Sequence, residues 1–370
     1  MQFTPRLLTM AIVIILIGFA PLSLGATLDN PTNVGSLQAE YQDFNFIAYG
    51  DSRASDFQGV SPLHEGIVTA YLEQSPELIL HTGDMVGWGA IYEQWTSFND
   101  SMTAVWEAGI PFYGAAGNHE KYTDVWYQYD LDQSNYTTFF DFSAAVDELG
   151  ETELYFSFDY EGIHFIILNT EDYFDDVEFG TDMFNSSEAQ MTWLLGDLSG
   201  TDPDDFVVVM FHRPAWSIRE NRPDRWAQAE TVRAEFHNIF VQYDVDLVLN
   251  GHDHYYYRTL RDDIYYVITG GGGAPLYSPD SSAPIWQTGD VAAGQYHYCN
   301  VAVNSTHVKI DVLKTDDTVI DSFTISRLAA TTSPTTPSTS TPIPMEIVVV
   351  GVVGIVVVIG VIIFVQMRRR

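Results

Sequence analysis

The sequence predicts an α/β fold in which two mixed β-sheets face each other and helices cover their outer sides, giving four layers. Apolar runs typical of buried strands alternate with helix-like segments, and the last third of the chain adds consecutive strand-like runs. Short polar motifs follow the apolar runs at regular intervals. Asp51 and Asp84 are 33 residues apart and Asp84 and Asn118 are 34 apart, which matches one strand–helix–strand unit of ~30 residues.

The expected elements follow one another from residue 44 to residue 325. Strands are expected at 44–49, 78–81, 111–115, 154–160, 164–169, 206–211, 247–249, 264–269, 296–303, 307–313 and 319–325. Helices are expected at 62–74, 91–108, 188–198 and 226–243. Polar motifs then lie at the carboxyl ends of parallel strands, which is where open α/β sheets bind their ligands.

The composition limits the possible partners of this chain. Its 370 residues carry a formal net charge of -34, so its surface repels nucleic acid and anionic lipid. The same charge repels phosphate esters, so a site for them needs positive charge of its own. A single cysteine, Cys299, excludes an internal disulfide, which favours a prokaryotic surface protein over an animal ectodomain.

Both ends of the chain have apolar segments of the kind that enter membranes. Residues 1–26 combine Arg6, an apolar run and small residues, which predicts a signal peptide, with an uncleaved anchor as the alternative. Residues 347–365 are an unbroken apolar stretch of 19 residues, followed by three arginines. This pattern predicts a transmembrane helix at 346–367 and a basic cytoplasmic tail at 368–370.

Between the two apolar ends we expect one folded domain and a stalk. The folded domain is expected at 40–328, and the Ser, Thr and Pro residues of 329–344 predict an extended stalk. The chain is therefore predicted to be a single-pass protein of the cell membrane, with its N-terminal domain outside the cell. Four sequons permit N-glycosylation, at Asn99, Asn135, Asn185 and Asn304.

Five short motifs carry the chemistry of the chain. They are Gly50-Asp51-Ser52-Arg53, Gly83-Asp84, Gly117-Asn118-His119-Glu120, His212-Arg213-Pro214 and Gly251-His252-Asp253-His254. Taken singly, each is typical of a turn or of a packed core histidine. Together they provide oxygen and nitrogen donors for two metal ions, and two-metal centres catalyse phosphoryl transfer. Imidazole, amide and carboxylate ligands suit Fe, Zn and Mn. The motifs do not indicate which of these metals is bound.

The ordered set of motifs resembles the calcineurin-like metallophosphoesterase superfamily, and among its branches the purple acid phosphatase-like group. The resemblance covers residues 44–326 and includes two further features, the segment 190–198 and the glycine run 270–273. It implies the calcineurin-like fold, two divalent or trivalent metal ions and a small phosphorylated substrate. It also implies hydrolysis of phosphate monoesters by a hydroxide that bridges the two ions.

The resemblance assigns a role to each matching position. Asp84 is expected to bridge both ions. Asp51 and His254 are expected to complete the first metal site, and Asn118, His212 and His252 the second. His119 is expected to act as the general acid, donating a proton to the leaving oxygen.

Two positions depart from the family pattern. The family commonly has a histidine two residues after the first Asp, where this chain has Arg53, and a guanidinium cannot ligate a metal. Purple acid phosphatases have a tyrosine three residues after the bridging Asp, where this chain has Gly87. We expect Arg53 to point into the site and bind phosphate oxygens as a second catalytic residue. The alternative is a salt bridge to a carboxylate such as Asp56.

Several arginines cluster after the fourth motif, although arginine is scarce in this chain. They are Arg213, Arg219, Arg222 and Arg225, and the first three are predicted to bind the substrate. The alternative is a set of salt bridges to Glu220, Asp224 and Glu230. Glu120 is expected either to orient His119 or to lie in solvent, and the glycine run 270–273 to allow close backbone packing.

Other functions remain open at this stage. One is a non-catalytic surface module for ligand binding or adhesion, with a degenerate metal site. Another is a nucleotidase or phosphodiesterase of the same fold.

Overall fold

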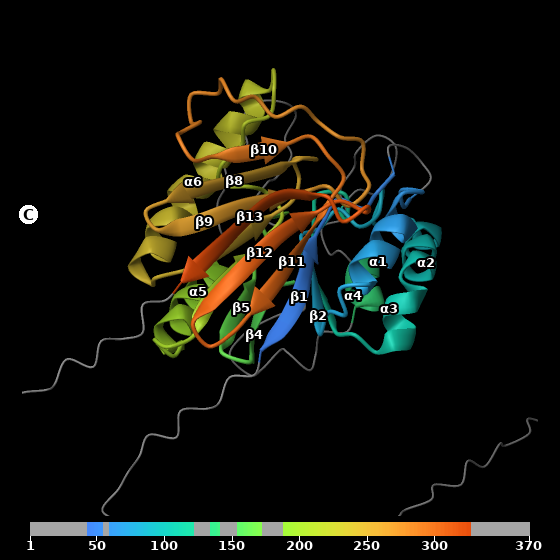
Figure 1. The fold of residues 1–370 in the computed structure, drawn as a ribbon, viewed down its shortest axis with the longest axis horizontal. Coiled ribbons are helices and arrows are strands. Elements are labelled where there is room, and N and C mark those ends of the chain that lie inside the picture. Colours follow the sequence, from blue (N-terminus) through green and yellow to red (C-terminus); the bar gives the residue numbers. More distant parts are fainter. Residues whose placement is uncertain (1–42, 55–58, 122–133, 141–153, 172–187, 327–370) are drawn as a thin grey trace, which may run out of the picture. The chain divides into compact units, whose positions relative to one another are not determined.

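The structure is a computed structural model that describes residues 43–54, 59–121, 134–140, 154–171 and 188–326 (Figure 1). The predicted signal peptide, stalk, membrane helix and basic tail lie outside these residues. Among the helices that the structure describes, none combines the length and the apolar composition needed to cross a membrane.

The first sheet has six strands in the order β13-β12-β11-β1-β2-β3. Its three parallel strands come from the N-terminal part of the chain, and Ile79 of β2 pairs with Ile47 of β1 and with Phe112 of β3. Three antiparallel strands from the C-terminal part extend the sheet. The strands are β1 (Phe44–Tyr49), β2 (Leu78–His81), β3 (Phe112–Gly114), β11 (Tyr298–Val303), β12 (His307–Leu313) and β13 (Val319–Ser326).

The second sheet has seven strands in the order β10-β8-β9-β7-β6-β5-β4. Its centre is parallel, because β6 pairs in parallel with β5 and β7, and β7 with β9. The strands are β4 (Phe156–Tyr160), β5 (Ile163–Ile167), β6 (Phe206–Met210), β7 (Leu247–Asn250), β8 (Tyr256–Arg261), β9 (Ile264–Thr269) and β10 (Val291–Ala293).

The two sheets pack face to face, and helices cover their outer sides (Figure 1). Phe46 of β1 and Phe165 of β5 meet edge to face between the sheets, with ring centroids 5.4 Å apart. A second apolar cluster joins the outer face of the second sheet to Trp193 and Phe236. The helices are α1 (His64–Leu72), α2 (Tyr92–Ser101), α3 (Thr103–Ala108), α4 (Ser134–Phe139), α5 (Glu188–Gly200) and α6 (Pro223–Gln242). The predicted four-layer α/β fold is confirmed.

Four details differ from the prediction. The single helix expected at 91–108 is two helices that meet at Met102, whose buried side chain lies against the hydroxyl of Tyr49. Met102 has φ -98° and ψ 3°, so the helical backbone is interrupted at this residue. Strands β8 and β10 and helix α4 were not predicted. The short β10 is recognisable only through its pairing with β8.

The topology brings the five motifs to one edge of the sheets. They follow β1, β2, β3, β6 and β7, which run parallel within each sheet, so their carboxyl ends lie at one edge. The backbone N–H of Asp51 donates to the carbonyl of Gly83, and that of Gly251 donates to the carbonyl of His212. The loops that carry the motifs are therefore joined to one another by backbone hydrogen bonds.

A buried histidine ties the second sheet to α5, and we predict a pH dependence of this contact. His164 contacts Asp197 through Nε2 at 2.9 Å and Asp159 through Nδ1 at 2.6 Å. Burial opposes the charged ring, but the two carboxylates outweigh it and raise the pKa of His164. A raised pKa in the folded state stabilises the fold below the unfolded pKa of about 6.5, and this contribution is lost as the pH rises through the folded pKa.

We expect His164→Gln to lower the free energy of unfolding by about 1 kcal/mol at pH 6 and by less at pH 9. The expected loss is small because Asp159 is 74% exposed and screened by solvent. Denaturant titrations of wild type and variant at both pH values measure the difference. A loss that is equal at pH 6 and pH 9 would contradict the prediction.

Candidate active site

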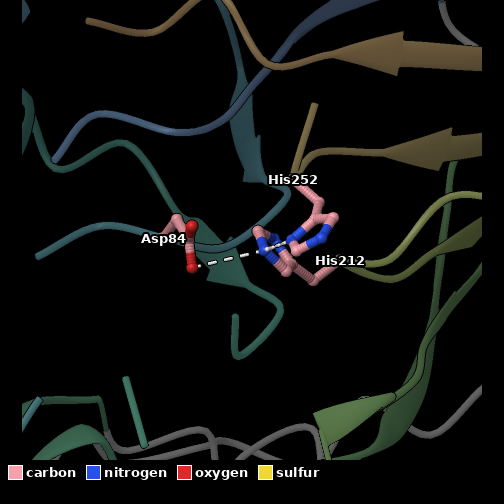
Figure 2. A group of neighbouring side chains, drawn as sticks. All are labelled: Asp84, His212 and His252. Carbon is pink, nitrogen blue, oxygen red and sulfur yellow. Dashed lines mark hydrogen bonds and ion pairs between the residues drawn. The ribbon is translucent and has the colours of Figure 1, made fainter. Parts of the chain in front are cut away.

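Asp84 lies at the centre of the site and belongs to two groups of potential metal ligands. One group is Asp84, His212 and His252, and the other is Asp51, Asp84 and His254. Within each group the ligand atoms all lie within 4.8 Å of one another, and all five residues are buried. His212 Nε2 lies 3.2 Å from Asp84 Oδ1 (Figure 2).

The remaining predicted ligand, Asn118, joins the group of Asp84, His212 and His252, which is the predicted second metal site. Its Oδ1 lies 3.2 Å from His212 Nε2, and His252 Nδ1 lies 3.2 Å from the same nitrogen. In the other group His254 Nε2 lies 3.4 Å from Asp51 Oδ1. The structure therefore brings together all six residues that the sequence predicts as metal ligands.

Backbone carbonyls orient two of the histidine rings. His212 Nδ1 donates to the carbonyl of Thr82 at 2.8 Å, and His254 Nδ1 donates to the carbonyl of Pro275 at 2.8 Å. In each ring Nε2 is then the atom that faces the carboxylates and that can offer its lone pair to an ion there. Second contacts of this kind are typical of histidines that ligate metals.

The electrostatics of the site favour positive charge beside Asp84. Burial raises the pKa of a carboxyl, but the charges of His212 and Arg53 outweigh it and hold the pKa of Asp84 well below its usual range. Burial likewise disfavours a charged His212, yet Asp84 and Asp51 raise its pKa to about 10. The buried carboxylates thus attract a cation at the position that His212 Nε2 faces.

Three of the predicted ligands have a backbone conformation that side chains rarely adopt. Asp51, Asp84 and His252 have φ values of 59°, 57° and 70°. Left-handed conformations at such residues cost about 1–3 kcal/mol each and cluster at functional sites. Here they turn the chain sharply after β1, β2 and β7.

These observations show that the residues fit two metal ions. The donors are carboxylate oxygens, an amide oxygen and imidazole nitrogens, which suit Fe, Zn and Mn. Asp84 is shared between the groups, as a bridging carboxylate must be.

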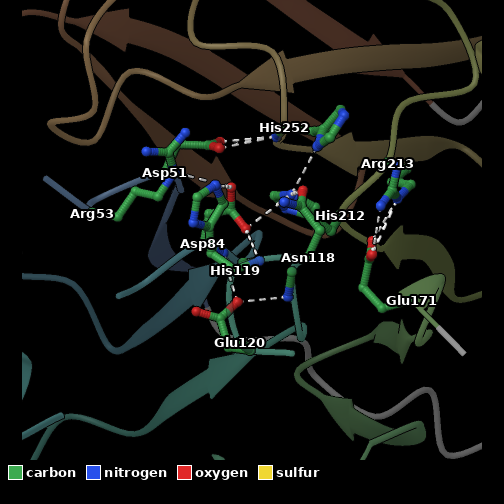
Figure 3. Close-up of polar contacts among 12 residues, drawn as sticks. Asp51, Arg53, Asp84, Asn118, His119, Glu120, Glu171, His212, Arg213 and His252 are labelled. Atoms are coloured by element: carbon green, nitrogen blue, oxygen red, sulfur yellow. Dashed lines mark hydrogen bonds and ion pairs between the residues drawn. The ribbon is translucent and has the colours of Figure 1, made fainter. Parts of the chain in front are cut away.

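His119 and Arg53 lie on the same side of Asp84 (Figure 3). His119 Nδ1 donates to the carbonyl of Gly87 at 2.6 Å, and His119 Nε2 lies 3.9 Å from Asp84 Oδ2. Burial and the charge of Arg53 lower the pKa of His119 to about 3. Arg53 Nε lies 3.4 Å from the same Asp84 oxygen. The guanidinium of Arg53 therefore lies beside the central carboxylate. The alternative partner, Asp56, lies outside the described residues.

Glu120 has a role that neither sequence hypothesis anticipated. Its buried carboxylate accepts the backbone N–H groups of Asp84 and Gly117 at Oε2, at 2.9 and 2.7 Å. Its other oxygen accepts those of Met85 and Val86, at 2.9 and 3.3 Å. Glu120 is thus neither in solvent nor a partner of His119. It clamps the loop of Asp84 to the loop of Asn118, and backbone partners of this kind leave no signal in a sequence.

The glycine residues of the site allow close backbone packing. The N–H of Gly272 donates to the carbonyl of Gly50 at 2.8 Å, which agrees with the packing role expected for 270–273. A Cβ at Gly117 would lie 2.4 Å from Asp84 Oδ1, so a side chain there would displace the central carboxylate.

The predicted substrate arginines make contacts with other protein groups. Arg213 is buried and pairs with Glu171 through Nε and Nη2 at 2.9 Å each (Figure 3). Arg222 pairs with Asp224 at 2.5 Å, and the guanidinium of Arg219 lies 3.3 Å from the ring centroid of Tyr277. The contacts of Arg213 and Arg222 favour the alternative of salt bridges within the protein.

We predict that the Glu120 clamp stabilises the site measurably. In Glu120→Gln, the amide nitrogen faces backbone N–H donors, so the free energy of unfolding should fall by about 1–3 kcal/mol. Denaturant titration measures the change, and the exposed Glu107→Gln on α3 is the matched control. Equal stability of the two variants would show that the clamp is not needed.

Comparison with known proteins agrees with this geometry. A family model described as calcineurin-like phosphoesterase matches residues 54–256, more than half of the 370 residues. A phosphoenolpyruvate phosphatase of Allium cepa is 27% identical over 236 residues, which are 59% of this chain and 43% of that protein. Purple acid phosphatase 13 of Arabidopsis thaliana is 29% identical over 194 residues, which are 50% of this chain and 32% of that protein.

Solved structures show the same fold. A purple acid phosphatase from seeds of yellow lupin (Lupinus luteus) superposes with a TM-score of 0.63 at 21% identity, covering 78% of this chain and 54% of that one. This chain spans less than half the length of the two curated relatives. With the family match, the shared fold and the metal ligands in place, the chain belongs to the calcineurin-like phosphoesterase family, and purple acid phosphatases are among its relatives.

Proposed function

We propose that this protein is a metal-dependent phosphatase that hydrolyses phosphate monoesters. The observation that carries the proposal is the convergence of six potential metal ligands, Asp84 among them, from five loops, with His119 beside them. A binding module has no need of an imidazole at that position. The preference for monoesters rests on the resemblance to purple acid phosphatases.

In this proposal Asp51, Asp84 and His254 hold the first ion. Asp84 also holds the second, together with Asn118, His212 and His252. Two such ions, when bound, supply a nucleophile near neutral pH and stabilise the charge that develops on the phosphoryl group. The loops that carry the ligands need to stay in place during the reaction, and the clamp of Glu120 on Asp84 and Gly117 serves this purpose.

His119 is proposed as the general acid. Its Nδ1 is held by the carbonyl of Gly87, so Nε2 is the nitrogen that faces Asp84 and the reacting group. A phosphate dianion next to Nε2 favours the protonated ring, opposing the burial that lowers the pKa of His119. The proton then passes from Nε2 to the leaving oxygen as the P–O bond breaks.

Arg53 is proposed to bind the phosphate. Its guanidinium is 11% exposed and lies beside Asp84 and His254. A guanidinium pairs with phosphate oxygens in a planar, two-point geometry. In an acidic protein this local positive charge offsets the repulsion of an anionic substrate.

The location of the protein is also a proposal. The apolar stretch 347–365 and the arginines after it support a membrane anchor, and 1–26 supports export of the folded domain. The phosphatase would then act outside the cell, at the end of the stalk 329–344.

The function is tested with purified full chain and p-nitrophenyl phosphate. We expect metal-dependent hydrolysis, and a loss of about 100-fold or more in kcat for Asp84→Asn and His119→Asn, because each removes a group that acts on the transition state. Arg53→Ala should raise KM, because the substrate loses a charged partner.

Two controls make the assay decisive. Glu107→Gln changes an exposed carboxylate on α3 and should retain the activity. Bis(p-nitrophenyl) phosphate tests the diesterase alternative, and it should be the poorer substrate. Absence of any hydrolysis by the metal-loaded wild type would favour a non-catalytic surface module.

The proposed anchor makes a separate prediction. Full-length protein expressed in cells should sediment with membranes, whereas a variant truncated after residue 345 should appear in the soluble or secreted fraction. Ultracentrifugation followed by immunoblotting measures this partition. If the truncated variant sediments like the full chain, the anchor does not lie at 346–367.

A further inference from the structure

Arg53 contacts the same atoms that the first metal ion needs. Its Nη2 lies 3.4 Å from His254 Nε2, and its Nε lies 3.4 Å from Asp84 Oδ2. Because a guanidinium only donates hydrogen bonds, the lone pair of His254 Nε2 is the acceptor. That nitrogen has one lone pair, so it can serve the guanidinium or a metal ion, but not both.

The ring of His254 cannot offer its other nitrogen instead. Its Nδ1 donates to the carbonyl of Pro275 at 2.8 Å. The ring of Tyr277 stacks on it, with centroids 4.0 Å apart and an interplanar angle of 15°. Both contacts hold Nε2 toward Asp51, Asp84 and Arg53.

The second metal site also has an arginine beside one of its ligands. Arg225 does contact a histidine there, but it binds His252 Nε2, at 2.7 Å. The other ring nitrogen, Nδ1, is the one that faces His212, at 3.2 Å. Because a guanidinium only donates, the neutral His252 ring that accepts from Arg225 carries its proton on Nδ1, so an ion at Nδ1 also requires this contact to open. Arg225 thus contacts one of the four ligands of the second site, whereas Arg53 contacts two of the three ligands of the first.

We propose that Arg53 is an internal cation that competes with the metal ion of the first site, so that the two sites differ in affinity. This inference rests on the proposed function, since it concerns the ions of that centre. The second site, with Asp84, Asn118, His212 and His252, binds its ion tightly. The first site, with Asp51, Asp84 and His254, binds an ion only when Arg53 is displaced from Asp84 and His254.

Charge balance accounts for an arginine at this position. Asp51 and Asp84 are both buried and close together, and two buried carboxylates repel each other without a cation. Arg53 supplies that positive charge from within the chain. When an ion takes over the neutralisation, the guanidinium is released beside the site, where it can bind a phosphate oxygen.

The test is a metal titration of the purified full chain in detergent. Protein stripped with a chelator is titrated with Zn²⁺ and followed by calorimetry. For the wild type we expect two classes of site. For Arg53→Met the weaker Kd should decrease by about tenfold or more, while the tighter Kd changes by less than about threefold.

Further variants separate the loss of the Arg53 charge from poor folding and from a general change in net charge. Arg53→Gln removes the charge but keeps a polar side chain, and it should tighten the weaker site as Arg53→Met does even if the latter folds poorly. Arg233→Met is the charge-matched control. Arg233 lies on α6, and its guanidinium packs over the ring of Trp216. A second readout is the melting temperature, which Zn²⁺ should raise more in Arg53→Met than in the wild type.

Two results would overturn the proposal. One is a weaker Kd that stays unchanged in Arg53→Met and Arg53→Gln, and the other is an equal change in Arg233→Met. The titration does not depend on hydrolysis. If the wild type shows no phosphatase activity but Arg53→Met tightens the weaker site, the proposed function fails and the competition stands. If the wild type hydrolyses the substrate but the weaker Kd is unchanged in Arg53→Met, the proposed function stands and the competition fails.

Discussion

The carboxylate of Asp84 is the constraint around which the site is built. It is buried, it belongs to both groups of metal ligands, and it contacts His212, Arg53 and the backbone N–H of His119. A buried carboxylate is stable only with positive charge or hydrogen bonds around it. The histidines, the arginine and any bound ions therefore all stabilise the buried charge of Asp84.

The fold meets this requirement with rigid elements and costly local geometry. Parallel strands of the two sheets end at the same edge, and hydrogen bonds to carbonyls of Thr82, Pro275 and Gly87 orient three histidine rings. Left-handed backbone at Asp51, Asp84 and His252 aims their side chains inward. Strained backbone persists where the surrounding structure holds it in place, and here the sheets pack through a large apolar core.

The placement of the arginines follows from the same logic. In a chain with a net charge of -34, positive groups near the centre either neutralise buried carboxylates or attract an anionic substrate. Arg213 does the first, through its pair with Glu171. Arg53 is proposed to do both in turn, because its partners, Asp84 and His254, are proposed ligands of the first metal ion.

The sequence by itself determined the layers of the fold and indicated the six residues that the structure brings together at the site. Strand-ending motifs such as Gly83-Asp84 and Gly251-His252-Asp253-His254 carry their chemistry in their side chains, and regular spacing locates them along parallel strands. Only the tertiary structure decided the partners of Glu120, Arg53 and Arg213. Their contacts are backbone N–H groups or residues far away in the chain, and no local pattern encodes which distant atom a side chain will meet.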